Sequence, residues 1–244
     1  RWEDPVTCSE HAASMGGSQI WLEPGEQMTV EELVKAAAVK SANDASMALA
    51  EHVSGSEGAF VDRMNARAQE LGMKDTHFVN PTGLDAEGHL STAYDVALMS
   101  RELLRHPDIT KYTTIWMDSL RDGKTSLVNT NKLVRFYEGC TGLKTGTTDG
   151  AGSCLSASAT RQGLSLIAVS MGSDTSDQRF AACKTLLNYG FSNYALVTPE
   201  PEDGIPPVPV VLGTQEFVTP VPQSDAPLLL EKARAAQIRT SVET

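Results

Sequence analysis

The period of the hydrophobic pattern changes near residue 120, and this change limits the possible folds more than any other feature. Before it, apolar residues recur at helical spacing, as in Phe60, Met64 and Ala68. After it, apolar residues such as Leu155 and Ala157 alternate with polar ones, as in a half-buried strand. A helical part followed by an antiparallel meander predicts an α+β layered domain.

Capping residues mark the helix starts. Thr29 and Glu32 have the spacing of a capping box, so a helix is predicted from Thr29 to Val39. Four more helices are predicted. The first follows Ser41, and the second runs from about Ser56 to Gly72. The third begins at Thr92 and ends before Pro107, and the fourth runs from Ser176 to Tyr189 with Gly190 as its cap.

Three strands are predicted at 139–147, 153–160 and 164–171. Asp149-Gly150 and Gln162-Gly163 supply the turns between them. Because such short turns join antiparallel neighbours, we expect a meander with the last predicted helix packed on it.

Composition changes near Thr198: eight of the twelve prolines lie between Pro199 and Pro227. Prolines at this density do not fit central strands or helix interiors, so the segment is predicted to be a linker leading to edge strands. We therefore assign residues 1–195 to one domain and 196–244 to the beginning of a small β-rich second domain. Its predicted elements are short strands at Val208–Leu212 and Glu216–Val221 and a weak helix at Pro227–Arg239.

The net charge of −11 argues against partners that are nucleic acids or anionic membrane surfaces. A small anionic ligand stays possible, because one lysine in a cleft can dominate the local field. The sequence has no run of 18 apolar residues, so no transmembrane helix and no membrane contact are predicted for this segment. It opens with Arg1 rather than Met, so we expect a processed or truncated chain.

The four cysteines are predicted to be free thiols. Cys140 and Cys154 flank a predicted hairpin out of register, and Cys183 falls on a helical apolar stripe. Cys8-x-x-His11 has no second Cys/His pair to complete a zinc site, so no metal site is predicted.

Ser41-Ala42-Asn43 has two interpretations. In the first, Ser41 caps the following helix, with Asp44 at the third helical position. In the second, the Ser41 hydroxyl passes a proton to a leaving amine and the Asn43 amide holds a substrate carbonyl.

Lys144-Thr145-Gly146 lies on a predicted strand, where a lysine is often only a solubilising residue. In a functional interpretation, Lys144 and Thr145 bind a carboxylate. Gly146, without a Cβ, lets a substrate backbone lie alongside the strand. Taken together, the two tripeptides are expected to face each other across one groove.

These motifs and several other stretches resemble the low-molecular-mass penicillin-binding proteins, the D-alanyl-D-alanine carboxypeptidases. The similarity covers roughly residues 5–195. The other matching stretches are Gly55-Ser56, Phe60, Met64-Asn65, Phe78–Leu84, His89–Asp95 and Gly152–Leu155. The resemblance implies a β-lactamase/transpeptidase-like fold, with an antiparallel sheet flanked by helices and a helical subdomain.

The resemblance also implies a mechanism that needs no cofactor or metal. A serine in a Ser-x-x-Lys motif attacks the terminal peptide bond of a peptidoglycan stem peptide that ends in D-Ala-D-Ala. Ser41 and Asn43 are then catalytic, and Lys144, Thr145 and Gly146 bind substrate. The sequence contains no Ser-x-x-Lys, and we expect that truncation removed it and left this segment inactive alone.

For the complete enzyme, the resemblance implies covalent inhibition by β-lactams and an extracytoplasmic location, in the cell envelope or secreted. It also implies a role in peptidoglycan biosynthesis and cell shape.

Two alternatives stay open: a class A-like β-lactamase and a non-catalytic peptidoglycan-binding protein. The first would need a general-base glutamate, for which Glu87 and Glu138 are the candidates in loop-like positions. A Ser-His-Asp triad using His77 or His89 is not favoured, because the sequence has no Gly-x-Ser-x-Gly.

Overall fold

The structure, a computed structural model, describes residues 1–198, 205–221, 226–235 and 237–238. It divides into two compact units. Unit 1 comprises Arg1–Thr160 and Ser165–Leu187, and unit 2 comprises Arg161–Leu164 and Asn188–Thr244. The domain boundary placed between residues 195 and 196 stays a prediction.

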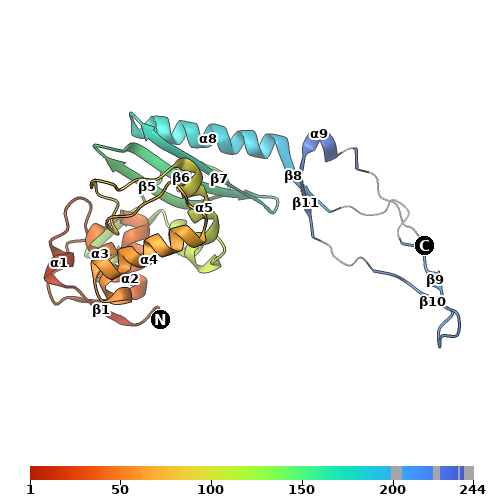
Figure 1. Cartoon of the computed structure of the whole chain (residues 1–244), viewed down its shortest axis with the longest axis horizontal. Helices are drawn as coiled ribbons and strands as arrows, with labels where there is room; N and C mark the ends of the chain where they lie inside the picture. Colours follow the sequence, from red (N-terminus) through yellow and green to blue (C-terminus); the bar gives the residue numbers. More distant parts are fainter. Residues whose placement is uncertain (199–204, 222–225, 236, 239–244) are drawn as a thin grey trace. The chain divides into compact units, whose positions relative to one another are not determined.

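The first part of unit 1 is mainly helical (Figure 1). Its longer helices are α2 (Val30–Lys35), the π-helix η1 (Ala36–Lys40), α3 (Asn43–Ser54), α4 (Glu57–Glu70) and α5 (Ala93–Leu103). Short turns of helix are α1 (Glu10–Ala13), η2 (Pro107–Ile109), α6 (Thr110–Thr113) and α7 (Leu133–Phe136).

Three predicted helix starts are confirmed by their caps. Thr29 and Glu32 form the complete capping box of α2. Ser56 accepts a hydrogen bond from the Ala59 amide at the start of α4, and Thr92 caps α5 in the same way.

The predicted meander is confirmed as a three-stranded sheet of order β5-β6-β7, and β5 lies at its edge. Its strands are β5 (Cys140–Thr148), β6 (Gly152–Arg161) and β7 (Leu164–Ser173). Between β6 and β7, Gln162 and Gly163 both have positive φ, 49° and 78°, as a tight hairpin turn requires.

Helices pack on both faces of this sheet (Figure 1). On one face, Ser156 of β6 shares a hydrogen bond with Ser100 of α5 at 2.7 Å. On the other face, α8 (Ser176–Asn193) buries Cys183, whose thiol donates to the Leu155 carbonyl. The Ser156 side chain of β6 therefore contacts α5, and the β6 backbone at Leu155 contacts α8.

Two antiparallel strand pairs that were not predicted complete unit 1. They pair β1 (Pro5–Thr7) with β2 (Gln27–Thr29) and β3 (Met117–Leu120) with β4 (Thr125–Val128). Both contribute to one hydrophobic core with α2, η1 and α3. The core residues are Val6, Cys8, Ala12, Ile20, Leu22, Met28, Leu33, Ala36, Val39, Ala42, Ala45, Met47, Ala48, Leu120 and Leu127.

The predicted end of the last helix at Gly190 is wrong, because α8 continues to Asn193. Gly190 is not among the residues with positive φ, so it does not form a left-handed cap. The side chain of Asn193 donates to the Tyr189 carbonyl at 2.8 Å and stabilises this last turn.

Unit 2 is built on a strand pair. β8 (Tyr194–Val197) pairs antiparallel with β11 (Leu228–Glu231), and α9 (Lys232–Ala235) follows. The weak helix predicted at Pro227–Arg239 is therefore wrong at its start, because pairing with β8 overrides a weak local propensity. Residues 236 and 239 of that prediction lie outside the described residues.

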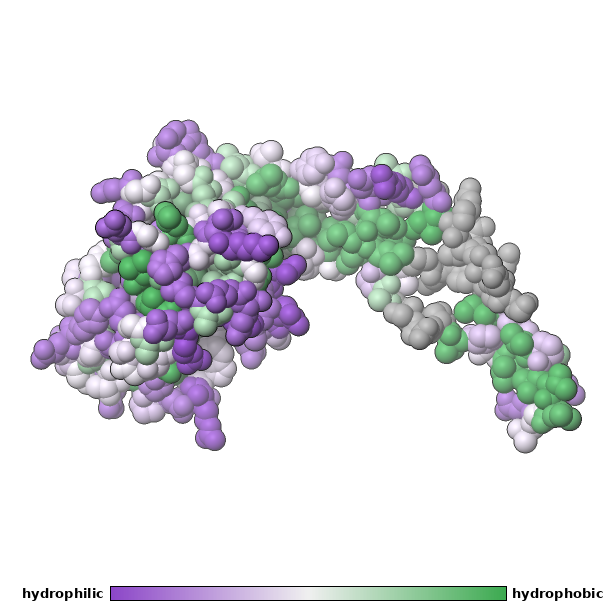
Figure 2. Space-filling view, in the orientation of Figure 1, coloured by the Kyte–Doolittle hydropathy of each residue, from purple (hydrophilic) through white to green (hydrophobic). Residues whose placement is uncertain are grey.

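The two other strands predicted in this unit are present but shorter. β9 (Val208–Pro209) pairs with β10 (Phe217–Val218). Pro209 has no amide proton to continue a ladder. Hydrophobic side chains gather on the visible surface of unit 2 (Figure 2), with Val211, Leu212 and Phe217 among the exposed ones.

All four cysteines are free thiols, as predicted. In the described part of the chain, no helix is long and apolar enough to cross a membrane.

Candidate active site

Ser41 occupies the junction between η1 and α3. Its backbone is left-handed, with φ 65° and ψ 37°. The capping interpretation of Ser41 is wrong: Ala42 is the N-cap residue of α3, and no side chain caps that position. Because Ser41 is the C-cap residue of η1 and α3 begins only at Asn43, the Ser41 hydroxyl is available to a distant partner.

That partner is Lys144. Its Nζ donates to Ser41 Oγ at 2.7 Å, across 103 residues of sequence. It also donates to the carbonyl of Thr145 at 2.6 Å. The expected meeting of the two tripeptides is therefore confirmed at the level of these two side chains. Their catalytic roles stay predictions.

Lys144 lies in an environment that disfavours its charge. Burial, and then the nearby Arg179 guanidinium, lower the pKa of Lys144 to about 8 from an ordinary lysine pKa of about 10.4. Below pH 8 the ammonium is protonated, and it forms no ion pair with a carboxylate in the described part of the chain.

A direct titration tests this environment. In the chain labelled with ¹³C at lysine Cε, we expect the Lys144 signal to titrate near pH 8, because its pKa is lowered. Binding that requires the ammonium must then weaken as the pH rises through this value. The Lys144→Arg variant assigns the signal by removing it. A midpoint near 10.4, the value of a free lysine, would contradict the described burial.

Thr145 and Gly146 differ in exposure. Thr145 is buried, and its hydroxyl donates to Thr130 Oγ1 at 2.6 Å. Gly146 is exposed, and a Cβ placed there would meet nothing within 4 Å in the described part of the chain. Neither internal packing nor a positive φ requires glycine at this position of the edge strand.

Arg179 of α8 was not predicted as a site residue. Its Nη1 donates to the Gly146 carbonyl at 2.7 Å and to Thr147 Oγ1 at 2.9 Å. Within the described residues its buried Nε has no hydrogen-bond partner. The sequence held one signal: Arg179 lies four and eight residues before Cys183 and Leu187, on the buried face of the helix.

The side chain of Asn43 makes a structural hydrogen bond in addition to its predicted catalytic role. Its side-chain Nδ2 donates to the Gly16 carbonyl at 2.8 Å, and its backbone amide donates to Ser18 at 2.7 Å. The amide thus fixes the loop before β2. Alignment of a substrate carbonyl by Asn43 stays a prediction.

Two other polar side chains, Asn129 and His89, have structural contacts. Buried Asn129 donates to the carbonyls of Thr113 and Ile115. His89 accepts a hydrogen bond from the Val79 amide, and burial lowers its pKa. No group of three metal-ligating side chains is arranged around a metal position in the described residues.

The family model for D-alanyl-D-alanine carboxypeptidases, peptidase S11, matches residues 1–175. The chain belongs to this carboxypeptidase family. It is 53% identical over 197 residues to D-alanyl-D-alanine carboxypeptidase DacF of Bacillus subtilis, covering 80% of this chain and 51% of the relative. It is 39% identical over 188 residues to DacC of Escherichia coli, covering 77% and 47%. The chain thus spans about half the length of these curated relatives.

Solved structures agree with the family assignment and confirm the fold class. Penicillin-binding protein 5 of Haemophilus influenzae is 32% identical with a TM-score of 0.80, covering 97% of this chain and 70% of that one. Penicillin-binding protein D2 of Listeria monocytogenes, in its cefotaxime-bound form, is 30% identical with a TM-score of 0.66, covering 78% of each chain. The β-lactamase and non-catalytic alternatives are not favoured by these relatives.

Proposed function

We propose that this chain supplies the proton-relay and carboxylate-binding side of a serine-type D-Ala-D-Ala carboxypeptidase that acts on peptidoglycan stem peptides outside the cytoplasm. The observation that carries the proposal is the 2.7 Å hydrogen bond between Lys144 and Ser41. It places a cation and a hydroxyl, from two motifs of the family, in one hydrogen-bonded unit. The family assignment supports the peptide substrate.

Substrate would bind along the edge of the sheet. β5 is one of the two edge strands of this sheet, and a Cβ at its exposed Gly146 would meet nothing within 4 Å in the described part of the chain. A peptide lying there extends the sheet by one strand. Lys144, with Thr145 beside it, would then bind the terminal carboxylate, while Arg179 holds the carbonyl of Gly146 in place.

The chemistry has two steps in this proposal. A serine hydroxyl attacks the carbonyl carbon between the two D-alanines, a C–O bond forms, and the C–N bond breaks. The departing amine takes its proton through the Ser41 hydroxyl. Water then hydrolyses the ester, which regenerates the serine and releases the shortened peptide. The 244 residues contain no Ser-x-x-Lys, so the attacking serine and its base come from outside them.

β-Lactams would acylate the same serine, because they present an amide and a carboxylate in the arrangement of the D-Ala-D-Ala end. The cefotaxime-bound structural relative supports this part of the proposal.

Loss of the lysine charge tests carboxylate recognition. In the enzyme that combines this chain with a Ser-x-x-Lys motif, Lys144→Ala is expected to lower kcat/KM about 10- to 100-fold for peptides ending in a free D-Ala carboxylate. A charge-assisted hydrogen bond contributes about 1.5–3 kcal/mol, and each 1.4 kcal/mol is about tenfold. C-terminally amidated analogues should lose less than about threefold.

Lys144→Arg, which keeps the charge, is the matched control and should retain more of the preference for the carboxylate. Equal losses for carboxylate and amide substrates would show that Lys144 does not read the carboxylate. No turnover of either substrate by the unmodified enzyme would refute the proposed function itself.

A further inference from the structure

A tryptophan stands exposed on a strained turn beside the Ser41 junction. Trp21 is 77% exposed, and its φ is 60°. Bulky side chains rarely adopt the left-handed region, and such strain persists only where the surrounding structure fixes it. Both its exposure and its backbone conformation therefore need an explanation.

The turn is held from both sides. The buried Asp44 carboxylate accepts hydrogen bonds from the amides of Ile20, at 3.1 Å, and Leu22, at 3.0 Å. The Arg121 guanidinium donates to the carbonyls of Ile20, at 2.7 Å, and Trp21, at 3.4 Å. The backbone groups around Trp21 are thus fixed by two charged side chains.

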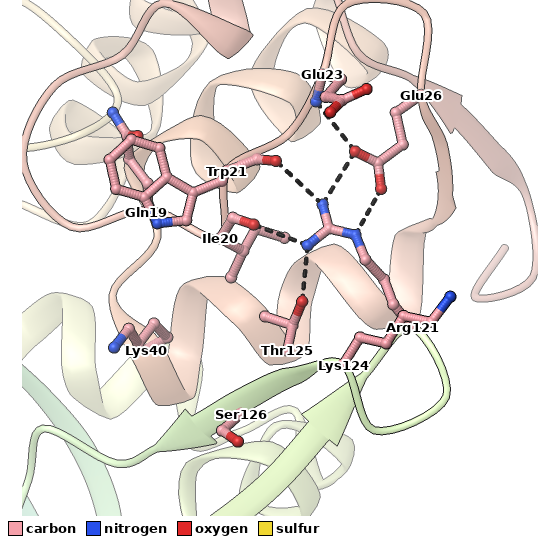
Figure 3. Close-up of a pocket in the computed structure, with 10 residues that line it drawn as sticks. All are labelled: Gln19, Ile20, Trp21, Glu23, Glu26, Lys40, Arg121, Lys124, Thr125 and Ser126. Carbon is pink, nitrogen blue, oxygen red and sulfur yellow. Dashed lines mark hydrogen bonds and ion pairs between the residues drawn. The ribbon is translucent and has the colours of Figure 1, made fainter.

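Further contacts make this arrangement rigid (Figure 3). Glu26 forms an ion pair with Arg121 at 2.7 Å, and Arg121 also donates to Thr125. Asp44 directly follows Asn43 of the Ser-Ala-Asn tripeptide. The turn that carries Trp21 is therefore hydrogen-bonded, through Asp44, to the start of α3, which follows Ser41.

Trp21 lines a pocket of about 540 Å³. The other groups on its wall are polar, apart from Ile20. They are Gln19, Glu23, Glu26, Lys40, Arg121, Lys124, Thr125 and Ser126 (Figure 3). In the described part of the chain, neither Lys40 nor Lys124 has an ion-pair partner.

One aromatic face within a rim of hydrogen-bonding groups suits a sugar ring. The C–H face of a pyranose meets the negative face of an indole, and its hydroxyl and acetamido groups need polar partners. An apolar ligand would remove water from Lys40 and Lys124, which have no ion-pair partner among the described residues, and this costs affinity. A nucleic acid is disfavoured by the net charge of −11.

We infer that the Trp21 pocket is a saccharide subsite for the amino sugar to which the stem peptide is attached. This inference rests on the proposed function and adds a second contact to the same substrate. Lys40 lines the pocket and directly precedes Ser41 in the sequence. An extended stem of four residues can span about 13 Å between its two ends.

Binding is tested on the chain itself with an N-acetylglucosamine–N-acetylmuramic acid disaccharide that carries no peptide. The disaccharide should change the tryptophan emission saturably, and Trp21→Phe should abolish this change. Lys40→Met should weaken binding several-fold, because it keeps the length of the side chain and removes the charge. The control Trp2→Phe alters another exposed tryptophan, which packs against Tyr112, and should keep the response.

Catalysis by the enzyme that includes a Ser-x-x-Lys motif separates the two proposals. Trp21→Ala should raise KM about tenfold for a pentapeptide attached to the disaccharide and leave the free pentapeptide unchanged. Equal effects on both substrates, or no saturable response to the disaccharide, would overturn the subsite. So would an emission shift with anionic lipid vesicles in place of saccharide. Saccharide binding without cleavage of either peptide would refute the carboxypeptidase proposal alone.

Discussion

Replacing Ser41 by alanine is expected to slow acylation by about 10²- to 10⁴-fold in the enzyme that combines this chain with a Ser-x-x-Lys motif, the range typical of a lost proton-transfer group. The hydroxyl accepts a hydrogen bond from Lys144 at 2.7 Å, and in the proposed mechanism it passes a proton to the departing amine. Alanine removes this oxygen and keeps the backbone. The measurement is the rate of acylation by a fluorescent penicillin, followed by stopped flow.

The fold should tolerate this change. Ser41 does not cap α3, so Ser41→Ala removes one half-buried hydrogen bond, which contributes about 1 kcal/mol. Ser46→Ala is the matched control, because that hydroxyl donates to the Ala42 carbonyl within the same helix. It should acylate at the unmodified rate. Unchanged acylation in Ser41→Ala, or a cooperative loss of structure, would remove Ser41 from the mechanism.

The helices and strands were predictable where their signals are local. Thr29 and Thr92 cap their helices through residues three positions away, which the sequence displays directly. The alternation of β6 and the tight turn at Gln162-Gly163 are equally local. Gly190 shows the limit of such local signals. Glycine permits a helix to end, but α8 continues past Gly190 to Asn193.

The site was predictable only in part, because its geometry depends on distant pairs. The resemblance to a family brought Ser41 and Lys144 together, but the left-handed turn at Ser41 has no signal in neighbouring residues. Arg179 was missed because its partners, Gly146 and Thr147, lie more than 30 residues away. The available clue to a structural or functional role was that Arg179, a cation, lies on the buried face of α8.

Asp44 is the clearest case of a residue whose local interpretation was wrong. The sequence placed it at the third position of a capped helix. In the structure its carboxylate accepts hydrogen bonds from Ile20 and Leu22, more than 20 residues earlier, and from the Ala45 amide. Ile20 and Leu22 lie in a loop without regular secondary structure, so no periodic sequence pattern could predict their contact with Asp44.

Asp44→Ala is therefore expected to lower the free energy of unfolding by about 4 kcal/mol. The change leaves three amides without their acceptor, and each unsatisfied buried donor costs about 1–3 kcal/mol. For a domain of this size the Tm should fall by roughly 10 °C. Chemical denaturation followed by circular dichroism measures the loss. Asp62→Ala, an exposed aspartate on α4, is the control and should change stability by less than about 0.5 kcal/mol.

Asp44→Asn distinguishes the hydrogen bonds from the volume of the side chain. It keeps one acceptor oxygen and the same size, so its loss should be about half that of Asp44→Ala. Both variants should also release the turn at Trp21, because the amides of Ile20 and Leu22 lose their fixed partner. The tryptophan should then become more mobile at temperatures where the fold persists, which fluorescence anisotropy detects. If the free energy of unfolding of Asp44→Ala lies within about 1 kcal/mol of that of the unmodified chain, Asp44 does not hold the turn. The explanation for the exposed indole then fails as well.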